Sequence, residues 1–400
     1  EMRAIMKRQL LHTPEGVRDI YNDECEKKML LQDQLYHILR LHGYHPIQTP
    51  TFEFFDIFGR EIGTTPSKDL YKFFDREGNT LVLRPDITPS IARCAAKYFG
   101  EEELPIRLCY MGNTFINNSS YQGRLKESTQ LGAELLGDPS VDADAEMISM
   151  VISCLKAAGL KEFQLSIGHA DFFRGLMEAA GLLEEQEEEL RELISNKNFF
   201  GVEEFVETLN LEENLKKLFG MLGNLYTGSD ELSAARECAA SYSRILKAIG
   251  DLEELHKILE VYEVSHYVSF ELGTISNYQY YTGIIFAGYT FGSGEAIVKG
   301  GRYDRLLTYF GKDSASIGFA FVIDQLMAAL QRQKIDVPVE RCVELMVYKP
   351  AKRQAAITAA AAARAAGCCV ELMLWDETKQ KEDYEDYAAR SRMTNMQFFA

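Results

Sequence analysis

The spacing of apolar side chains predicts a regular helix near the start of the chain. Between positions 22 and 41 apolar residues recur at helical intervals, and a His-Gly pair follows. The stripe consists of Met29, Leu30, Leu35, Ile38 and Leu39. Shorter runs rich in aromatic and β-branched residues then predict strands. We expect a hairpin over 72–75 and 80–83, strands over 106–111, 129–136 and 163–168, and a helix over 142–158.

The pattern changes near residue 171, and from there to about 259 it predicts only short helices. Strand patterns return later in the chain, and a helix follows from about 324. A polar linker with a proline covers 333–339. The expected elements after the helical stretch are strands over 268–272, 280–289, 295–299, 343–348 and 370–374, and an alanine-rich helix over 351–366.

Together these elements predict an α+β protein with a mixed, mostly antiparallel sheet flanked by helices. We expect a core over residues 1–332, interrupted by a helical insertion at about 171–259. A small α/β unit of two strands and a helix or two is expected over residues 341–400.

Composition narrows the possible functions. The 43 basic and 60 acidic residues give a formal net charge of −17, which argues against nucleic-acid binding by bulk electrostatics. No apolar run is long enough for a membrane span, and residues 1–9 do not read as a secretory signal, so we expect a cytoplasmic protein. The cysteines and histidines lack metal-ligand spacing, and we expect neither a metal nor a cofactor.

Six segments of the chain resemble segments of histidyl-tRNA synthetases, and they occur in the same order as in that family. They are Thr-Pro-Glu-Gly-Val-Arg-Asp at 13–19, Gly-Tyr-His-Pro at 43–46, Leu-Arg-Pro-Asp-Ile-Thr at 83–88, the stretch 122–134, Tyr-Tyr-Thr-Gly at 280–283, and Gly-Gly-Arg-Tyr-Asp at 300–304. The resemblance covers roughly residues 10–330 and implies a class II aminoacyl-tRNA synthetase-like core.

Three positions depart from that family's pattern, and all three lie where a working synthetase carries an arginine. By resemblance, these arginines hold the phosphates of ATP or the substrate carboxylate. The chain has Ile116, Ser276 and Gln325 instead. Chemistry on ATP depends on such cations, and loss of one donor typically costs about two to three orders of magnitude in rate. The sequence therefore predicts no adenylate formation.

The amino-acid pocket of the family is better kept. The resemblance implies that Asp86, Thr88 and Gln130 bind an α-amino group and that Glu134 and Tyr281 hold an imidazole. Asp86 is one methylene shorter than the family's glutamate. Arg124 is a candidate partner for the ligand carboxylate. Tyr280 lies next to Tyr281 and is a further candidate for histidine binding, and its alternative role is packing. The same polar residues are also compatible with remnants of an emptied pocket.

A synthetase core without its ATP arginines resembles the regulatory subunits of ATP phosphoribosyltransferase. This resemblance implies a short-form catalytic subunit as partner, L-histidine as feedback effector, and a homodimer, formed through the strand near 43–50, within a larger hetero-oligomer. Histidine would bind in the old pocket or between the chains. The tail lacks a concentrated basic face, so tRNA binding is not expected. The alternatives are an atypical active histidyl-tRNA synthetase and a synthetase-like module with another partner.

Overall fold

The computed structural model describes residues 11–59, 65–118, 125–275, 280–339 and 343–400. The chain divides into two compact units, the first ending at Val337 and the second formed by Pro338–Ala400. Within the described ranges, no helix is long and apolar enough to cross a membrane.

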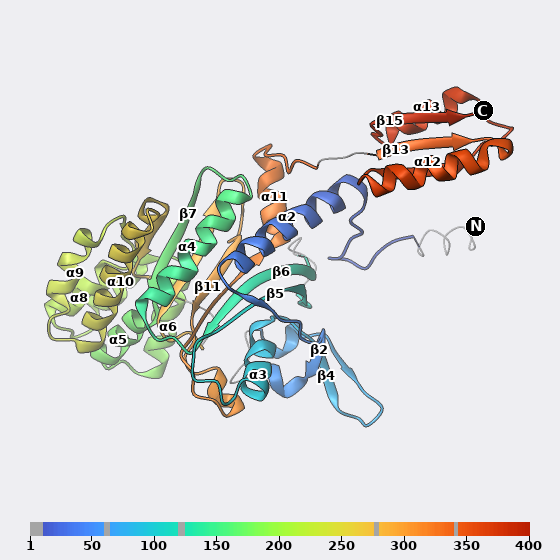
Figure 1. The fold of residues 1–400 in the computed structure, drawn as a ribbon. Helices are drawn as coiled ribbons and strands as arrows, with labels where there is room; N and C mark the ends of the chain where they lie inside the picture. Colours follow the sequence, from blue (N-terminus) through green and yellow to red (C-terminus); the bar gives the residue numbers. More distant parts are fainter. Residues whose placement is uncertain (1–10, 60–64, 119–124, 276–279, 340–342) are drawn as a thin grey trace, which may run out of the picture. The chain divides into compact units, whose positions relative to one another are not determined.

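A mixed, mostly antiparallel sheet organises the first unit (Figure 1). Over the described residues it has nine strands, of which only the β1–β5 and β7–β9 pairs are parallel. In spatial order they are β1 (His45–Pro46), β5 (Ile106–Phe115), β6 (Glu127–Leu136), β12 (Ser316–Val322), β11 (Val298–Arg302), β10 (Ile284–Thr290), β7 (Phe163–His169), β9 (Val268–Glu271) and β8 (Leu225–Tyr226). The predicted α+β class is confirmed.

A second, small antiparallel sheet contains the predicted hairpin. Its strands are β2 (Phe52–Phe54), β4 (Thr80–Leu83) and β3 (Lys72–Phe74), in that spatial order. After β4 the chain enters α3 (Thr88–Tyr98), a helix that the apolar spacing did not predict. Pro89 near its start is a common residue in the first turn of a helix, because its missing N–H would have no partner there.

The first helix, α2 (Asn22–Leu41), has the predicted bounds but a different buried stripe. Leu31, Leu35 and Leu39, each four residues apart, are fully buried, whereas Met29 is 58% exposed. Residues four apart lie above one another on a helix, so this leucine row faces the sheet. Gly43 adopts a φ of +82° directly after the helix, a conformation that favours glycine.

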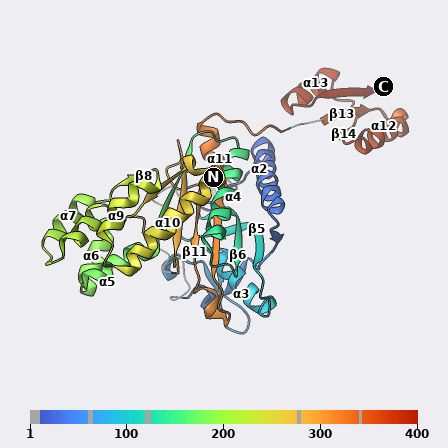
Figure 2. The same cartoon turned by 60° about the vertical axis from the view of Figure 1, so that its left-hand side comes forward.

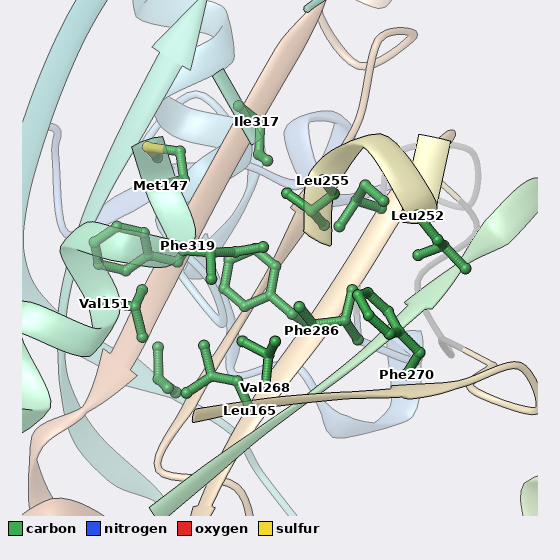
Figure 3. Close-up of a cluster of buried hydrophobic side chains, with 14 of the residues drawn as sticks. Met147, Val151, Leu165, Leu252, Leu255, Val268, Phe270, Phe286, Ile317 and Phe319 are labelled. Carbon is green, nitrogen blue, oxygen red and sulfur yellow. The ribbon is translucent and has the colours of Figure 1, made fainter. Parts of the chain in front are cut away.

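The helices that cover one face of the large sheet include α2, α4 (Val141–Ala157) and α10 (Ser243–Val261). Figure 2 shows them on the same side of the strands. Met147 and Val151 of α4 lie near Phe319 of β12, and Leu252 and Leu255 of α10 belong to the same cluster (Figure 3). Since alternate strand residues face opposite ways, positions 131, 133 and 135 of β6 enter this core. Positions 130, 132 and 134 therefore face the other side.

A helical module follows β7, as predicted. It consists of α5 (Ala170–Ala180), α6 (Glu184–Ser195), α7 (Phe199–Glu207), α8 (Glu213–Gly220), α9 (Ser233–Cys238) and α10. The expectation of helices alone is wrong, because β8 lies within the module and pairs with β9 at the edge of the large sheet. The chain leaves the module through β9 and later forms β12 and α11 (Ile323–Arg332).

Two later strands begin after their predicted positions. The pattern at 280–289 predicted one strand, but β10 starts at Ile284, where its ladder with β7 begins. Thr282 instead donates its backbone N–H to the Arg302 carbonyl, 2.7 Å away. Likewise, 295–299 was expected to be a strand, whereas β11 runs from Val298 to Arg302.

The second unit is a small parallel α/β fold. Its sheet has the order β14–β13–β15, with α12 and α13 as the connecting helices. The expectation of two strands is wrong, because the chain adds a third, β15, which pairs with β13. The elements are β13 (Val343–Tyr348), α12 (Arg353–Ala365), β14 (Cys369–Leu374), α13 (Lys381–Arg390) and β15 (Asn395–Phe399).

A buried ion pair joins the central sheet to the start of α4. The Arg302 guanidinium lies 2.7 Å from the Asp144 carboxylate, and the two side chains are 7% and 4% exposed. Arg302 also donates to the carbonyls of Asp138 (2.9 Å) and Ser140 (3.1 Å). Asp144 lies in the first turn of α4, where the helix dipole favours negative charge.

Replacing Arg302 with leucine leaves the Asp144 carboxylate buried without its cation. We expect the free energy of unfolding of the first unit to fall by about 3–5 kcal/mol, which urea titration would measure. Lys257→Ala, which breaks an exposed pair with Glu254, is the control and should cost less than about 1 kcal/mol. Equal effects of the two substitutions would contradict a structural role for the buried pair.

Candidate functional site

A buried carboxylate, Glu134, lies on β6 at the middle of the large sheet. It is 1% exposed and points to the face that α2, α4 and α10 leave uncovered. Directly opposite it on β12 is Gly318. A Cβ atom at position 318 would fall 1.6 Å from Glu134 Oε2. Only glycine at this position therefore lets the carboxylate lie across the neighbouring strand.

Two hydroxyl groups donate to the Glu134 carboxylate, one to each oxygen. Thr88 Oγ1 donates to Oε1 at 2.9 Å, and the Tyr303 hydroxyl donates to Oε2. Thr88 is the first residue of α3, and Tyr303 directly follows β11. Segments far apart in the sequence thus meet on the carboxylate, and both of its oxygens have a hydrogen-bond partner.

A second buried carboxylate, Asp86, lies just before α3. Its Oδ1 accepts the backbone N–H of Ile87 at 2.7 Å, and that of Thr88 lies at 3.5 Å. N–H groups at a helix start lack partners within the helix, so a carboxylate there is favourable. Asp86 therefore fixes the start of the helix that carries Thr88.

Three buried tyrosines extend the cluster away from Glu134. The ring of Tyr280 lies edge-on to those of Tyr281 and Tyr303, with centroid separations of 4.9 and 5.8 Å. Arg174 of α5 donates to the Tyr281 carbonyl at 2.7 Å. A chain of direct contacts therefore runs from the helical module, through the tyrosines, to the Glu134 carboxylate.

Two polar side chains near Glu134 lack partners in the described part of the chain. They are the Tyr110 hydroxyl on β5 and the Gln130 carbonyl oxygen on β6, both buried. Buried polar groups almost always have a hydrogen-bond partner, and each exception needs an explanation. Both groups lie on the strand face that carries Glu134, where a bound polar molecule would satisfy them.

Burial raises the pKa values of the two carboxyl groups in the cluster. It raises the pKa of Glu134 to about 8, against the hydrogen bonds from Tyr303 and Thr88, which lower it. It raises the pKa of Asp86 to about 6, against the backbone N–H groups that favour the ionised form. At neutral pH Asp86 is therefore mostly ionised and Glu134 mostly protonated. The cluster can accept a cation at Asp86 and exchange a proton at Glu134.

The structure brings most of the predicted pocket residues together. Thr88 and Glu134 are in direct contact, Asp86 adjoins Thr88, and Gln130 shares the strand face. Tyr280 and Tyr281 join the cluster through Tyr303. Arg124, the candidate partner for a carboxylate, and Ser276 lie outside the described residues.

Sequence reasoning missed two site residues, Tyr110 and Tyr303. Tyr303 lies two residues after Gly301, which is opposite Gly318 on β12 and so belongs to the strand face that carries Glu134. Tyr110 lies directly opposite Gly132, two residues from Glu134 on the neighbouring strand. Alternation along each strand could have indicated both residues, once the order of the strands was known.

The positions at which the resemblance expects ATP-binding arginines carry uncharged side chains. Ile116 is half-buried, with its backbone N–H bonded to the Lys126 carbonyl, and Gln325 lies in the first turn of α11. The nearby Arg84 is buried and donates to the carbonyls of Asn113 (2.8 Å) and Thr49 (3.0 Å). Its guanidinium thus braces the backbone.

Comparison with known proteins identifies relatives over nearly the whole chain. The sequence profile of the family described as histidyl-tRNA synthetase matches residues 16–326. An ATP phosphoribosyltransferase regulatory subunit from Acetivibrio thermocellus is 41% identical over 90% of this chain and 86% of its own length. One from Ruminiclostridium cellulolyticum is 38% identical over 97% of this chain and 92% of its own length.

A solved structure has the same fold from end to end. It is described as an ATP phosphoribosyltransferase regulatory subunit/histidyl-tRNA synthetase from Bacillus halodurans. It is 32% identical to this chain, covers 98% of each chain, and superposes with a TM-score of 0.85.

The raised pKa of Glu134 predicts a pH dependence of stability. Between the ordinary value of 4.5 and about 8, the folded chain holds a proton that the unfolded chain has released. The free energy of unfolding should therefore fall as pH rises through this window, and Glu134→Gln should remove that contribution. Urea midpoints at pH 5, 6, 7 and 8 measure the difference between the two proteins, which should grow with pH. Parallel profiles would contradict the assignment; Glu127→Gln on the same strand is the control.

Proposed function

The chain belongs to the histidyl-tRNA synthetase family and, within it, to the ATP phosphoribosyltransferase regulatory subunits, and from this premise we propose that it regulates a separate catalytic chain. The partner is a short-form catalytic subunit that condenses ATP with phosphoribosyl pyrophosphate, the first step of histidine biosynthesis. This chain is required for that activity and confers feedback inhibition by L-histidine. It forms a homodimer within a larger hetero-oligomer and does not bind tRNA.

One contrast carries this proposal. The amino-acid cluster is kept as a connected set of buried groups, with Thr88 and Tyr303 donating to Glu134 and Asp86 fixed at the start of α3. At the positions of the ATP arginines, Ile116 and Gln325 supply no charge. A site that keeps its amino-acid contacts and lacks its phosphate contacts supports binding of the amino acid without its activation.

Histidine matches the charges of the cluster. Its α-ammonium group pairs with Asp86, which is ionised at neutral pH. Its imidazole offers an N–H donor to Glu134, and Glu134 can release a proton when a cationic or donating group arrives. The carbonyl oxygen of Gln130, which lacks a hydrogen-bond partner among the described residues, accepts a further N–H of the ligand. The ligand thereby supplies hydrogen bonds that the empty cluster lacks.

The tyrosine chain connects this pocket to the helical module. Arg174 of α5 holds the Tyr281 carbonyl, and Asp171 in the same helix pairs with Arg244 of α10 at 2.7 Å. A ligand that moves the Tyr281 segment therefore acts on two helices of the module. Histidine regulates the complex only if it binds one arrangement better than another, and a coupling of about 1–3 kcal/mol changes affinity roughly 5–150-fold.

Mixing this chain with a short-form catalytic subunit tests the proposal. We expect phosphoribosyl-ATP formation only in the mixture, and a fall in its rate on adding millimolar histidine. Glu134→Ala should keep activation and lose the histidine response, because the pocket loses its central acceptor. Glu127→Ala, on the same strand but with a carboxylate bonded to Asn113, should behave like the unaltered chain.

The outcomes separate the two parts of the proposal. Absence of association and activation would overturn the regulatory role itself. Activation that histidine does not change would overturn only the effector role, and inhibition that persists in Glu134→Ala would place histidine outside this cluster.

An assay of pyrophosphate exchange tests the alternative of an active synthetase. With histidine and ATP, we expect no exchange above background, since each missing cationic donor costs about two to three orders of magnitude in rate. A histidyl-tRNA synthetase is the positive control. Histidine-dependent exchange by this chain would refute its assignment as non-catalytic.

A further inference from the structure

The sheet of the second unit has an open edge at β14. This strand lies at one end of the order β14–β13–β15 and pairs with β13 alone. Trp375 donates its backbone N–H to the Tyr348 carbonyl at 2.8 Å, so backbone groups at odd-numbered positions point toward β13. Those at 370, 372 and 374 therefore point outward. Arg364 of α12 donates to the first of these carbonyls at 2.9 Å. The outward N–H and C=O groups of Leu372 and Leu374 are available to a further strand.

A cleft lies between this edge strand and α13. It has a volume of about 370 Å³, and its lining includes Met373 and Leu374 of β14 and Tyr384 and Tyr387 of α13. Leu374 is 50% exposed. The Tyr387 hydroxyl donates to Glu371 of β14 at 2.7 Å, which holds the helix beside the strand. A groove between an edge strand and a helix is suited to an added strand, because it receives that strand's alternate side chains.

Four charged side chains also line the cleft, and only the two cations lack ionic partners. Asp376 accepts the N–H and the hydroxyl of Thr378, at 2.9 and 2.7 Å. Asp383 accepts a backbone N–H at the start of α13, at 2.8 Å. Lys379 and Arg390 form no ion pair among the residues that the structure describes. The acids are thus held by local hydrogen bonds, and the cations are left to pair with carboxylates of a ligand.

We propose that β14 and this cleft form a docking site for an extended acidic segment of a partner protein, which adds to the sheet as a strand. The outward backbone groups of Leu372 and Leu374 bond to its backbone, and the cleft receives an apolar side chain. Lys379 and Arg390 pair with its carboxylates. The open edge selects an extended segment, because a helix has no free backbone groups along its length. This inference concerns the second unit alone and does not depend on the histidine pocket.

The test uses the full chain, with Trp375 as the reporter. It is the only tryptophan, and its ring stacks on Tyr384, with centroids 5.1 Å apart. An acetylated peptide of alternating valine and aspartate should bind and change the tryptophan fluorescence. The same peptide with lysine in place of aspartate should bind about tenfold more weakly. A version methylated at alternate backbone nitrogens should not bind, since it cannot pair with β14. Equal binding of the methylated and unmethylated peptides would overturn strand addition.

Matched variants locate the contact. Leu374→Pro removes an outward N–H but no bond to β13, and it should bind the peptide about tenfold more weakly than Leu374→Ala, which keeps the N–H. Arg390→Gln should weaken binding by about two- to fivefold. Lys381→Gln, in the same helix but paired with Glu385 at 2.9 Å, should bind as the unaltered chain does.

Two results would contradict the proposal. If Leu374→Pro and Arg390→Gln both bind the acidic peptide as their controls do, the site lies elsewhere. Sedimentation of the chain alone tests the other occupant of the edge, a second copy. If Leu374→Pro, unlike Leu374→Ala, dissociates an oligomer of the free chain, β14 pairs with a second copy and is closed to a partner.

Discussion

The burial of the Glu134 carboxylate is the constraint on which the site depends. A carboxylate in the middle of a sheet needs space and hydrogen bonds, and here both come from distant parts of the sequence. Gly318 on the next strand supplies the space, and Thr88 and Tyr303 supply the donors. Asp86 fixes the start of α3 and so places Thr88. Because each support lies on a different element, the pocket exists only in the folded sheet.

One face of the large sheet is apolar, and the other carries the polar cluster. The face under α2, α4 and α10 is a continuous apolar core, and Phe319 on β12 belongs to it. The residue before it on β12, Gly318, belongs to the opposite face of the sheet. A stiff apolar layer thus lies directly behind the polar cluster and fixes strand positions on which the contact with Glu134 depends. The Arg302–Asp144 pair adds a polar anchor between β11 and α4.

Local pattern in the sequence predicted what local physics decides. Periodicity predicted the bounds of α2 and the hairpin of β3 and β4, and the motif pointed to the acid at 134 as a site residue. The sequence pattern did not indicate that β6 lies beside β12, because strand order results from packing across the whole core. The roles of Tyr303, Tyr110 and Gly318 depend on that order. The third strand of the second unit was missed for a similar reason: β15 is stabilised by pairing with β13.

Loss of catalytic groups does not require loss of binding groups, and the geometry explains why. The groups proposed to contact the amino acid are buried and bonded to one another, so removing Thr88 or Tyr303 leaves Glu134 with an unmatched oxygen and should destabilise the fold. The arginine positions lie near the strand end at Ile116 and in the first turn of α11 at Gln325, where uncharged side chains leave the core intact. The proposed loss of chemistry on ATP therefore carries little structural cost, whereas the buried polar cluster is held by the fold. The proposed binding of an amino acid without its activation requires a cluster of this kind, and Arg174 joins it to the helical module.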